Sequence, residues 1–225
     1  MNRLSHFLPL AVVGLLSLQG SGCLPKPSTV ATRSYLLAPL PAASPTTPGR
    51  QEPAIGVGIV KMPAYLLKTS LAVRAGTNEI TYLESSLWAE RLDLSFQRTL
   101  AANLSTRVPT DRIRLSSWSR HEVDRAVYVS VDRFDVDAQG SGTISAWWRI
   151  TSASGDKTLQ GGEFQTTRPG TPPSQRPDAV ALTLSDLTAA LSEEIAKALR
   201  NSLQSADSTP SLEKLPAPVP DQIIR

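Results

Sequence analysis

The stretch AVYVSVDRFDVD (126–137), followed by GTISAWWRIT (142–151) and KTLQGGEFQTT (157–167), decides the fold. In its first segment, valines alternate at positions 127, 129 and 131, and apolar residues resume at 134 and 136 with the phase shifted by one. Alternation of period two is typical of a strand with one buried face, and a bulge near Asp132 and Arg133 accounts for the shift. Turn-like residues separate the three segments, which predicts an antiparallel meander.

The second segment contains two adjacent tryptophans, Trp147 and Trp148. Successive side chains of a strand point to opposite faces of the sheet. Because Trp148 shares its face with the apolar residues at 144, 146 and 150, we expect Trp148 in the core. Trp147 then lies on the other face, where it is a candidate contact residue for a partner or a lipid.

Two amphipathic helices flank the strands. After Ser86, a predicted N-cap, apolar residues share one helical face as far as Pro109, at Trp88, Leu92, Phe96, Leu100 and Leu104. A second helix is predicted from Pro177-Asp178 to about Leu203. Because the apolar face of each helix must be buried, we expect a single α+β domain, with an antiparallel or mixed sheet packed against two main helices.

Shorter apolar runs between prolines or turn residues predict further strands. They are residues 34–38, residues 55–60, and a hairpin that joins residues 71–74 to residues 79–83. Gly56 and Gly58 lie in the second of these runs without the remaining residues of a phosphate-binding loop. We therefore interpret them as structural glycines of a packed strand.

The N-terminus has the layout of a secretory signal, with Arg3, an apolar stretch over residues 7–18 and small residues at 20–22. The stretch is shorter than the roughly 20 apolar residues of a membrane span. The run GSGC (20–23) resembles a lipobox, and this resemblance implies cleavage before Cys23 and a covalent lipid on its thiol. The alternative is an ordinary signal peptide followed by a free thiol. Cys23 is the only cysteine, so intramolecular disulfides are excluded.

Proline-rich and polar stretches divide the rest of the chain. We expect a signal peptide over 1–22 and a lipidated cysteine with its spacer over 23–33. The domain then covers 34–204, including a proline-rich loop at 41–53, and a proline-rich tail covers 205–225.

Motifs of catalysis and metal binding are missing from the sequence. His6 leaves with the signal, so a mature chain holds only His121, which lies in a polar stretch and is interpreted as a surface residue. The sequence has no CxxC, HExxH or GxSxG motif, and we expect no catalytic residue, metal site or cofactor beyond the lipid. Asp132, Asp135 and Asp137 suggest a calcium or acid/base site, but a solvated strand face is favoured.

The charge balance argues against a polyanionic partner. Removal of Arg3 lowers the formal net charge from +3 to +2, so we expect no binding to nucleic acid. One predicted loop combines a tryptophan with basic residues, namely Trp118 with Arg112, Arg114, Arg120 and Arg125. These residues are candidates for contact with anionic lipid headgroups or a protein partner, and a plain solvated loop is the alternative.

The order of these segments resembles the ABC-type transport auxiliary lipoproteins, the PqiC-like or YmbA-like family. The stretches that carry the likeness are SYLLAP (34–39), IGVGIVKMPAYL (55–66), WAE (88–90), VYVSVDRFDV (127–136) and SAWWRI (145–150). The resemblance implies a non-enzymatic envelope component that works with an MCE-domain protein and ABC transporter subunits in intermembrane lipid transport. A homo-oligomer is compatible with it.

The resemblance also implies a location. Leu24 follows the cysteine where aspartate signals retention in the inner membrane of enteric bacteria, so we expect the outer membrane, with the domain facing the periplasm. The alternative function is a lipoprotein chaperone or plug in outer-membrane assembly, serving lipopolysaccharide or β-barrel insertion.

Overall fold

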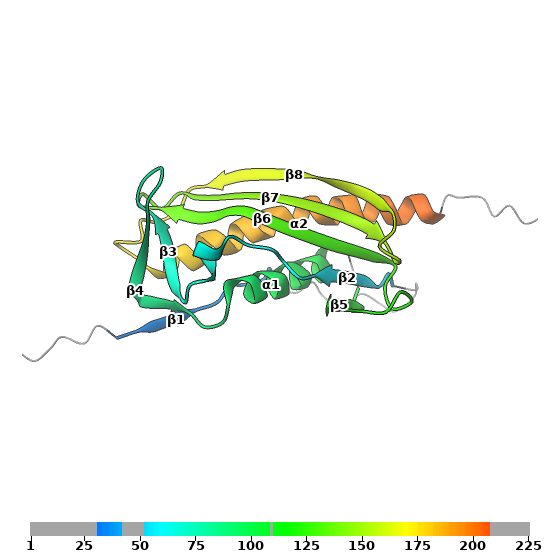
Figure 1. The fold of residues 1–225 in the computed structure, drawn as a ribbon, viewed down its shortest axis with the longest axis horizontal. Coiled ribbons are helices and arrows are strands. Elements are labelled where there is room, and N and C mark those ends of the chain that lie inside the picture. Colours follow the sequence, from blue (N-terminus) through cyan, green and yellow to red (C-terminus); the bar gives the residue numbers. More distant parts are fainter. Residues whose placement is uncertain (1–30, 42–51, 109, 208–225) are drawn as a thin grey trace, which may run out of the picture. The chain divides into compact units, whose positions relative to one another are not determined.

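The computed structural model describes residues 31–41, 52–108 and 110–207. Within these ranges the chain forms one mixed eight-stranded sheet and two α-helices, which confirms the predicted α+β class (Figure 1). The strands are β1 (Arg33–Tyr35), β2 (Ile55–Gly58), β3 (Ser70–Arg74), β4 (Ile80–Trp88), β5 (Ile113–Ser116), β6 (Arg125–Asp137), β7 (Gly142–Ser152) and β8 (Thr158–Arg168). The helices are α1 (Leu92–Arg107), α2 (Asp178–Asp207) and the short 3-10 helix η1 (Ala64–Leu67).

Strand β6 organises the sheet. One of its sides pairs with β7, which pairs in turn with β8, and both pairings are antiparallel. Its other side is shared by β2 and β3, which run parallel to it. The predicted meander is therefore confirmed, and so is its bulge: Val131 lies opposite Ala146 and Arg133 opposite Ser145, so Asp132 has no partner in the ladder.

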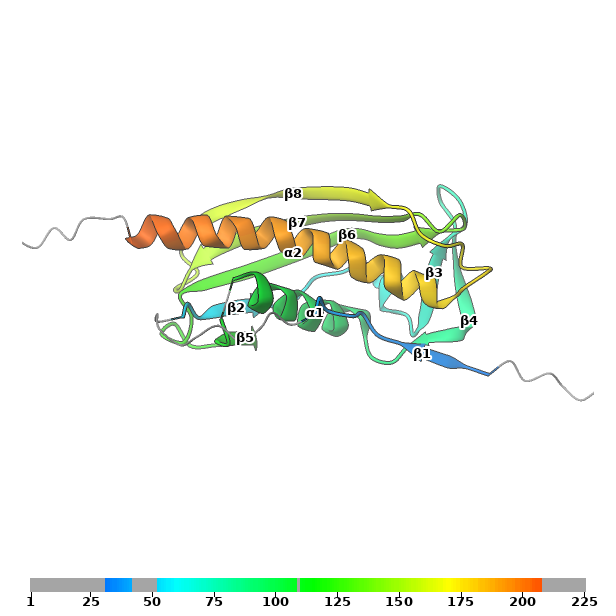
Figure 2. The ribbon, with the colours of Figure 1, turned by 180° about the vertical axis from the view of Figure 1, so that it is seen from behind.

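Helix α2 covers one face of the β6–β8 strands, and α1 packs against α2, β2 and β5. Helix α2 contacts β6, β7, β8 and α1, and it lies behind the three strands in Figure 1 and in front of them in Figure 2. Its apolar face is fully buried at Leu187, Leu191 and Ile195. On α1, the ring of Phe96 meets the ring of Phe134 edge to face, with ring centroids 5.2 Å apart.

Polar residues on both helices hold the chain after β1. The backbone N–H groups of Leu37, Ala38 and Leu40 donate to Ser95 Oγ, Ser185 Oγ and Asn103 Oδ1, over 3.3, 2.9 and 2.8 Å. An extended segment without a strand partner needs such acceptors when it is buried. The segment that follows β1 is thereby fixed to both helices.

The first helix starts later than the sequence predicts. Ser86 and Trp88 belong to β4, where they pair with Arg33 and Tyr35 of β1, and the helix begins only at Leu92. Pairing on both sides of β4 satisfies this backbone and outweighs the helical spacing of Trp88. The sequence also missed strand β5, which pairs in parallel with β2.

Two turn glycines should respond differently to the same substitution. Gly140 and Gly155 both have positive φ, at 94° and 77°, where alanine is strained. A Cβ atom on Gly140 would lie 2.5 Å from the backbone of Thr171, whereas one on Gly155 would meet nothing within 4 Å. We expect Gly155→Ala to lower the free energy of unfolding by about 1 kcal/mol and Gly140→Ala by clearly more. Urea unfolding of both variants measures the difference, and equal losses would contradict it.

Candidate docking surface

The β6–β8 strands have one face that α1 and α2 do not cover. We call this face the outer face, and its central side chains are Tyr128, Ser130, Trp147, Arg149 and Glu163. Trp147 lies at its centre, opposite Ser130 on β6 and Glu163 on β8. The side chain of Trp147 is 53% exposed, whereas Trp148 on the inner face is 8% exposed. The predicted burial of the two tryptophans is confirmed, and the role of Trp147 as a contact residue stays a prediction.

A row of rings and a guanidinium extends from the outer face toward β5. The guanidinium of Arg149 lies 4.9 Å from the centroid of the Tyr128 ring, and that centroid is 6.3 Å from the ring of Trp118. The rings occupy the space that the two strand glycines leave free, because a Cβ atom would lie 2.7 Å from Trp118 at Gly56 and 2.6 Å from Tyr128 at Gly58. Gly56 and Gly58 are therefore structural, as predicted.

The basic residues predicted to share a loop with Trp118 lie on several elements. Arg112 precedes β5 and donates to the backbone oxygen of Glu52, while Arg114 lies within β5 and is exposed. Arg120 lies in the loop between β5 and β6, 3.9 Å from Asp156 of the turn between β7 and β8. Arg125 begins β6, and its Nη2 donates to the backbone oxygen of Ser202 on α2. Their contact with lipid or a partner stays a prediction.

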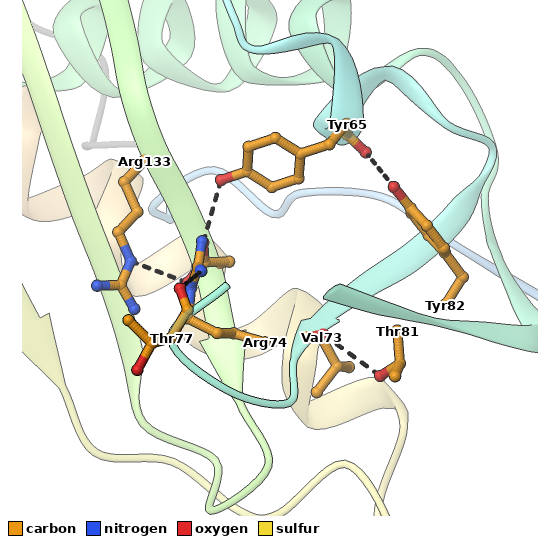
Figure 3. A network of polar contacts seen from close by, with 8 residues as sticks. Tyr65, Val73, Arg74, Thr77, Thr81, Tyr82 and Arg133 are labelled. Atoms are coloured by element: carbon orange, nitrogen blue, oxygen red, sulfur yellow. Dashed lines mark hydrogen bonds and ion pairs between the residues drawn. The ribbon is translucent and has the colours of Figure 1, made fainter. Parts of the chain in front are cut away.

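A buried ion network lies on the same side of β6, beyond the bulge (Figure 3). Asp135 has no exposed side-chain surface, and its oxygens accept from Arg74 Nη2 at 2.6 Å, Arg133 Nε at 3.0 Å and Tyr65 Oη at 3.1 Å. The network joins η1, β3 and β6, and Tyr82 extends it by donating to the backbone oxygen of Tyr65. The interpretation of the aspartates as a solvated strand face is wrong for Asp135.

The network shifts the pKa values of Asp135 and Tyr65 away from neutral pH. Burial alone raises the pKa of Asp135, but the hydrogen bonds from Arg74 and Arg133 outweigh it and hold this pKa below its ordinary value. Burial and the nearby carboxylate raise the pKa of Tyr65 to about 12. A catalytic acid or base works best with a pKa near the working pH, so this network is suited to holding elements together.

The remaining predicted sites lie apart from the outer face or outside the described residues. His121 is exposed in the loop before β6. In the described part of the chain, no three histidine, cysteine or acidic side chains form a metal-binding group. Neither helix in those ranges combines the length and the apolar character of a membrane span. Cys23, most of the 41–53 loop and most of the C-terminal tail lie outside the described residues.

The fold and the outer face place the protein in the class of small α+β domains that have one sheet face without a covering α-helix. Residues 35–196 match the family described as ABC-type transport auxiliary lipoprotein component. The chain belongs to this family, which confirms the resemblance drawn from the sequence.

Solved structures share the fold. An uncharacterised protein with a crystal structure is 21% identical, with a TM-score of 0.56, over 74% of this chain and 99% of its own. A protein from Xanthomonas campestris is 16% identical, with a TM-score of 0.56, over 80% of this chain and 98% of its own. At these identities the likeness concerns the fold alone. A search of curated proteins finds no match.

Proposed function

We propose that this protein is a lipid-anchored, non-enzymatic accessory subunit of an MCE and ABC-type system that moves lipids between membranes. Membership of the ABC-type transport auxiliary lipoprotein family supports a role beside a transporter. The signal layout and the single Cys23 support a lipid anchor, with Leu24 favouring the outer membrane and a domain in the periplasm. Several acyl chains on one residue hold a protein to a membrane stably.

The observation that carries this proposal is the exposed Trp147 on a rigid, uncovered sheet face. Tryptophan is enriched among the residues that dominate binding energy at protein interfaces, because it buries a large area with little loss of side-chain freedom. Pairing with β6 and β8 holds the backbone of Trp147, and the 53% exposure of its side chain leaves the ring accessible to a partner. The outer face is therefore a docking surface for a subunit of the transport system.

A non-enzymatic role agrees with the chemistry of the side chains. The buried carboxylate of Asp135 is held ionised by two arginines, and His121 lies in an exposed loop. In such a role the protein tethers and positions other subunits, while the ATPase supplies the energy.

Replacement of Trp147 by alanine should separate the protein from its partners. A central interface tryptophan contributes about 2 kcal/mol or more, so we expect roughly 30-fold weaker capture of MCE and ABC subunits by the tagged full-length protein from envelope fractions. Quantitative mass spectrometry of the captured subunits measures the effect.

Leu182→Ala is the matched control for this experiment. Leu182 is also 53% exposed, but it lies on α2, in the layer behind the sheet, so its removal should leave capture unchanged. Recovery of lipopolysaccharide or β-barrel assembly components in place of transport subunits would support the chaperone or plug function. Equal capture by Trp147→Ala and the wild type would contradict the docking surface.

A further inference from the structure

Strand β8 forms a long edge of the sheet with only one neighbour. Residues 160–168 pair with residues 150–142 of β7 without a break, and the one irregularity of this ladder lies before them. No other described segment pairs with β8. The two other edge strands are short, with three residues in β1 and four in β5. The free edge of β8 is therefore the longest row of unpaired backbone groups on the described sheet.

This edge has few of the features that normally block strand addition. Natural edge strands are protected by proline, by lysine, by inward-pointing charges or by bulges in mid-strand. Strand β8, with the sequence TLQGGEFQTTR, contains no proline or lysine, and its two charged residues are Glu163 and Arg168. Glu163 points to the outer face, beside Trp147, so it does not close the inner side of the edge.

A buried donor without an acceptor lies against the same strand. Gly162 lies next to the ring of Trp148: a Cβ atom placed on Gly162 would be 3.9 Å from Cζ2 of this tryptophan. The indole Nε1–H of Trp148 is buried and has no acceptor among the described residues. A buried donor without an acceptor normally destabilises a fold, so this indole N–H calls for an explanation. An added chain at Gly162 would bring further backbone and side-chain oxygens to this part of the sheet.

We propose that the free edge of β8 receives an extended segment of a partner subunit as an additional strand. The partner's identity rests on the function proposed above, whereas the mode of binding follows from β8 itself. Main-chain hydrogen bonds to an exposed edge give such complexes their affinity, and alternate side chains give them specificity. Because Trp147 and Glu163 are cross-strand neighbours, the added strand would extend the outer face without a gap.

The environment of β8 defines the chemistry of the incoming segment. On the outer face, Glu163 favours lysine or arginine directly opposite it. On the inner face, the half-buried Phe164 and the side of α2 favour apolar residues. A second copy of β8 fits poorly, because its only apolar side chains are Leu159 and Phe164, and a register centred on Glu163 would oppose two carboxylates. The occupant is thus an alternating apolar and polar segment with a basic residue.

Two neighbouring substitutions test this proposal. Thr166 points to the inner face, opposite Ile144, and Gln165 points to the outer face, opposite Ser145. In Thr166→Lys, the ammonium group reaches water past the free edge, but an added strand would bury it. In Gln165→Lys, the new charge points to the outer face, outside its five central side chains, so the added strand itself does not bury it. Thermal unfolding of both variants verifies that each remains folded.

The measurement is hydrogen exchange of the 158–168 segment in the full-length lipidated protein, in native envelope membranes and after purification. We expect exchange to be slower in membranes for the wild type and Gln165→Lys, by about tenfold or more, and equally fast in both states for Thr166→Lys. Equal exchange of the wild-type segment in both states would overturn the proposal, even if transport subunits are captured. Slower exchange in membranes without capture of transport subunits would leave the strand addition standing and refute the proposed function.

Discussion

Asp135→Ala should lower the free energy of unfolding by about 3 kcal/mol at neutral pH, because it leaves two guanidinium groups without their carboxylate. The side chain of Asp135 is fully buried, and those of Arg74 and Arg133 are 20% and 40% exposed. Loss of one partner from a buried ion pair costs most when the other partner stays buried, so Arg74 should account for most of the effect. Urea unfolding of the purified domain measures the change.

The difference in free energy of unfolding between the wild type and Asp135→Ala should disappear in acid. The folded-state pKa of Asp135 lies below its ordinary value, so the stability from the ionised carboxylate is fully present above the ordinary pKa. That stability is lost as the pH falls through the lower, folded-state pKa. The gap between wild type and Asp135→Ala should therefore be constant near neutral pH and shrink below about pH 4.

Asp132→Ala provides the control on the same strand. Asp132 is the exposed bulge residue and forms no ion pair with Arg74 or Arg133, so its loss should change the free energy of unfolding by less than about 0.5 kcal/mol. If the difference in free energy of unfolding between the wild type and Asp135→Ala stays the same below about pH 4, the charge of Asp135 does not stabilise the fold.

The sequence predicted the features of the fold that depend on alternation within one segment. The shifted phase between Val131 and Phe134 located the bulge of β6, and the pairing confirms it at Asp132. The same reasoning assigned Trp148 to the core and Trp147 to the surface. Both results follow from the period-two geometry of a strand, which needs no knowledge of distant residues.

The errors concern contacts between distant segments. Trp88 fits the helical spacing of the residues that follow it, but β1 and β3 pair with this stretch and keep it extended. The network of Asp135 was missed for the same reason, since Arg74 and Tyr65 lie 61 and 70 residues away in sequence. The bulge had been noted, but only the fold brings η1 and β3 to the face of β6 that carries Asp135.

The candidate docking surface was predicted in part. Trp147 was identified from alternation, and Trp118 from its position among arginines, but no local pattern relates Trp118 to Tyr128 and Arg149. That row of side chains depends on Gly56 and Gly58, which leave space for the two rings. A glycine in a strand is a signal for close approach of another group, although it does not specify which group.

Phe134→Ala should destabilise the domain by about 3 to 5 kcal/mol, the usual range for loss of a buried phenylalanine. Phe134 is fully buried, and its edge-to-face contact with Phe96 joins the sheet to α1. Phe164→Ala makes the same chemical change on the edge strand β8, where the ring is half-buried. Because the surroundings can close around the gap, we expect this variant to lose only about 1 to 2 kcal/mol of the free energy of unfolding. Urea unfolding gives both values, and hydrogen exchange should accelerate in α1 for Phe134→Ala alone. Equal losses for the two variants would mean that the contact between Phe96 and Phe134 does not determine how α1 is held against the sheet.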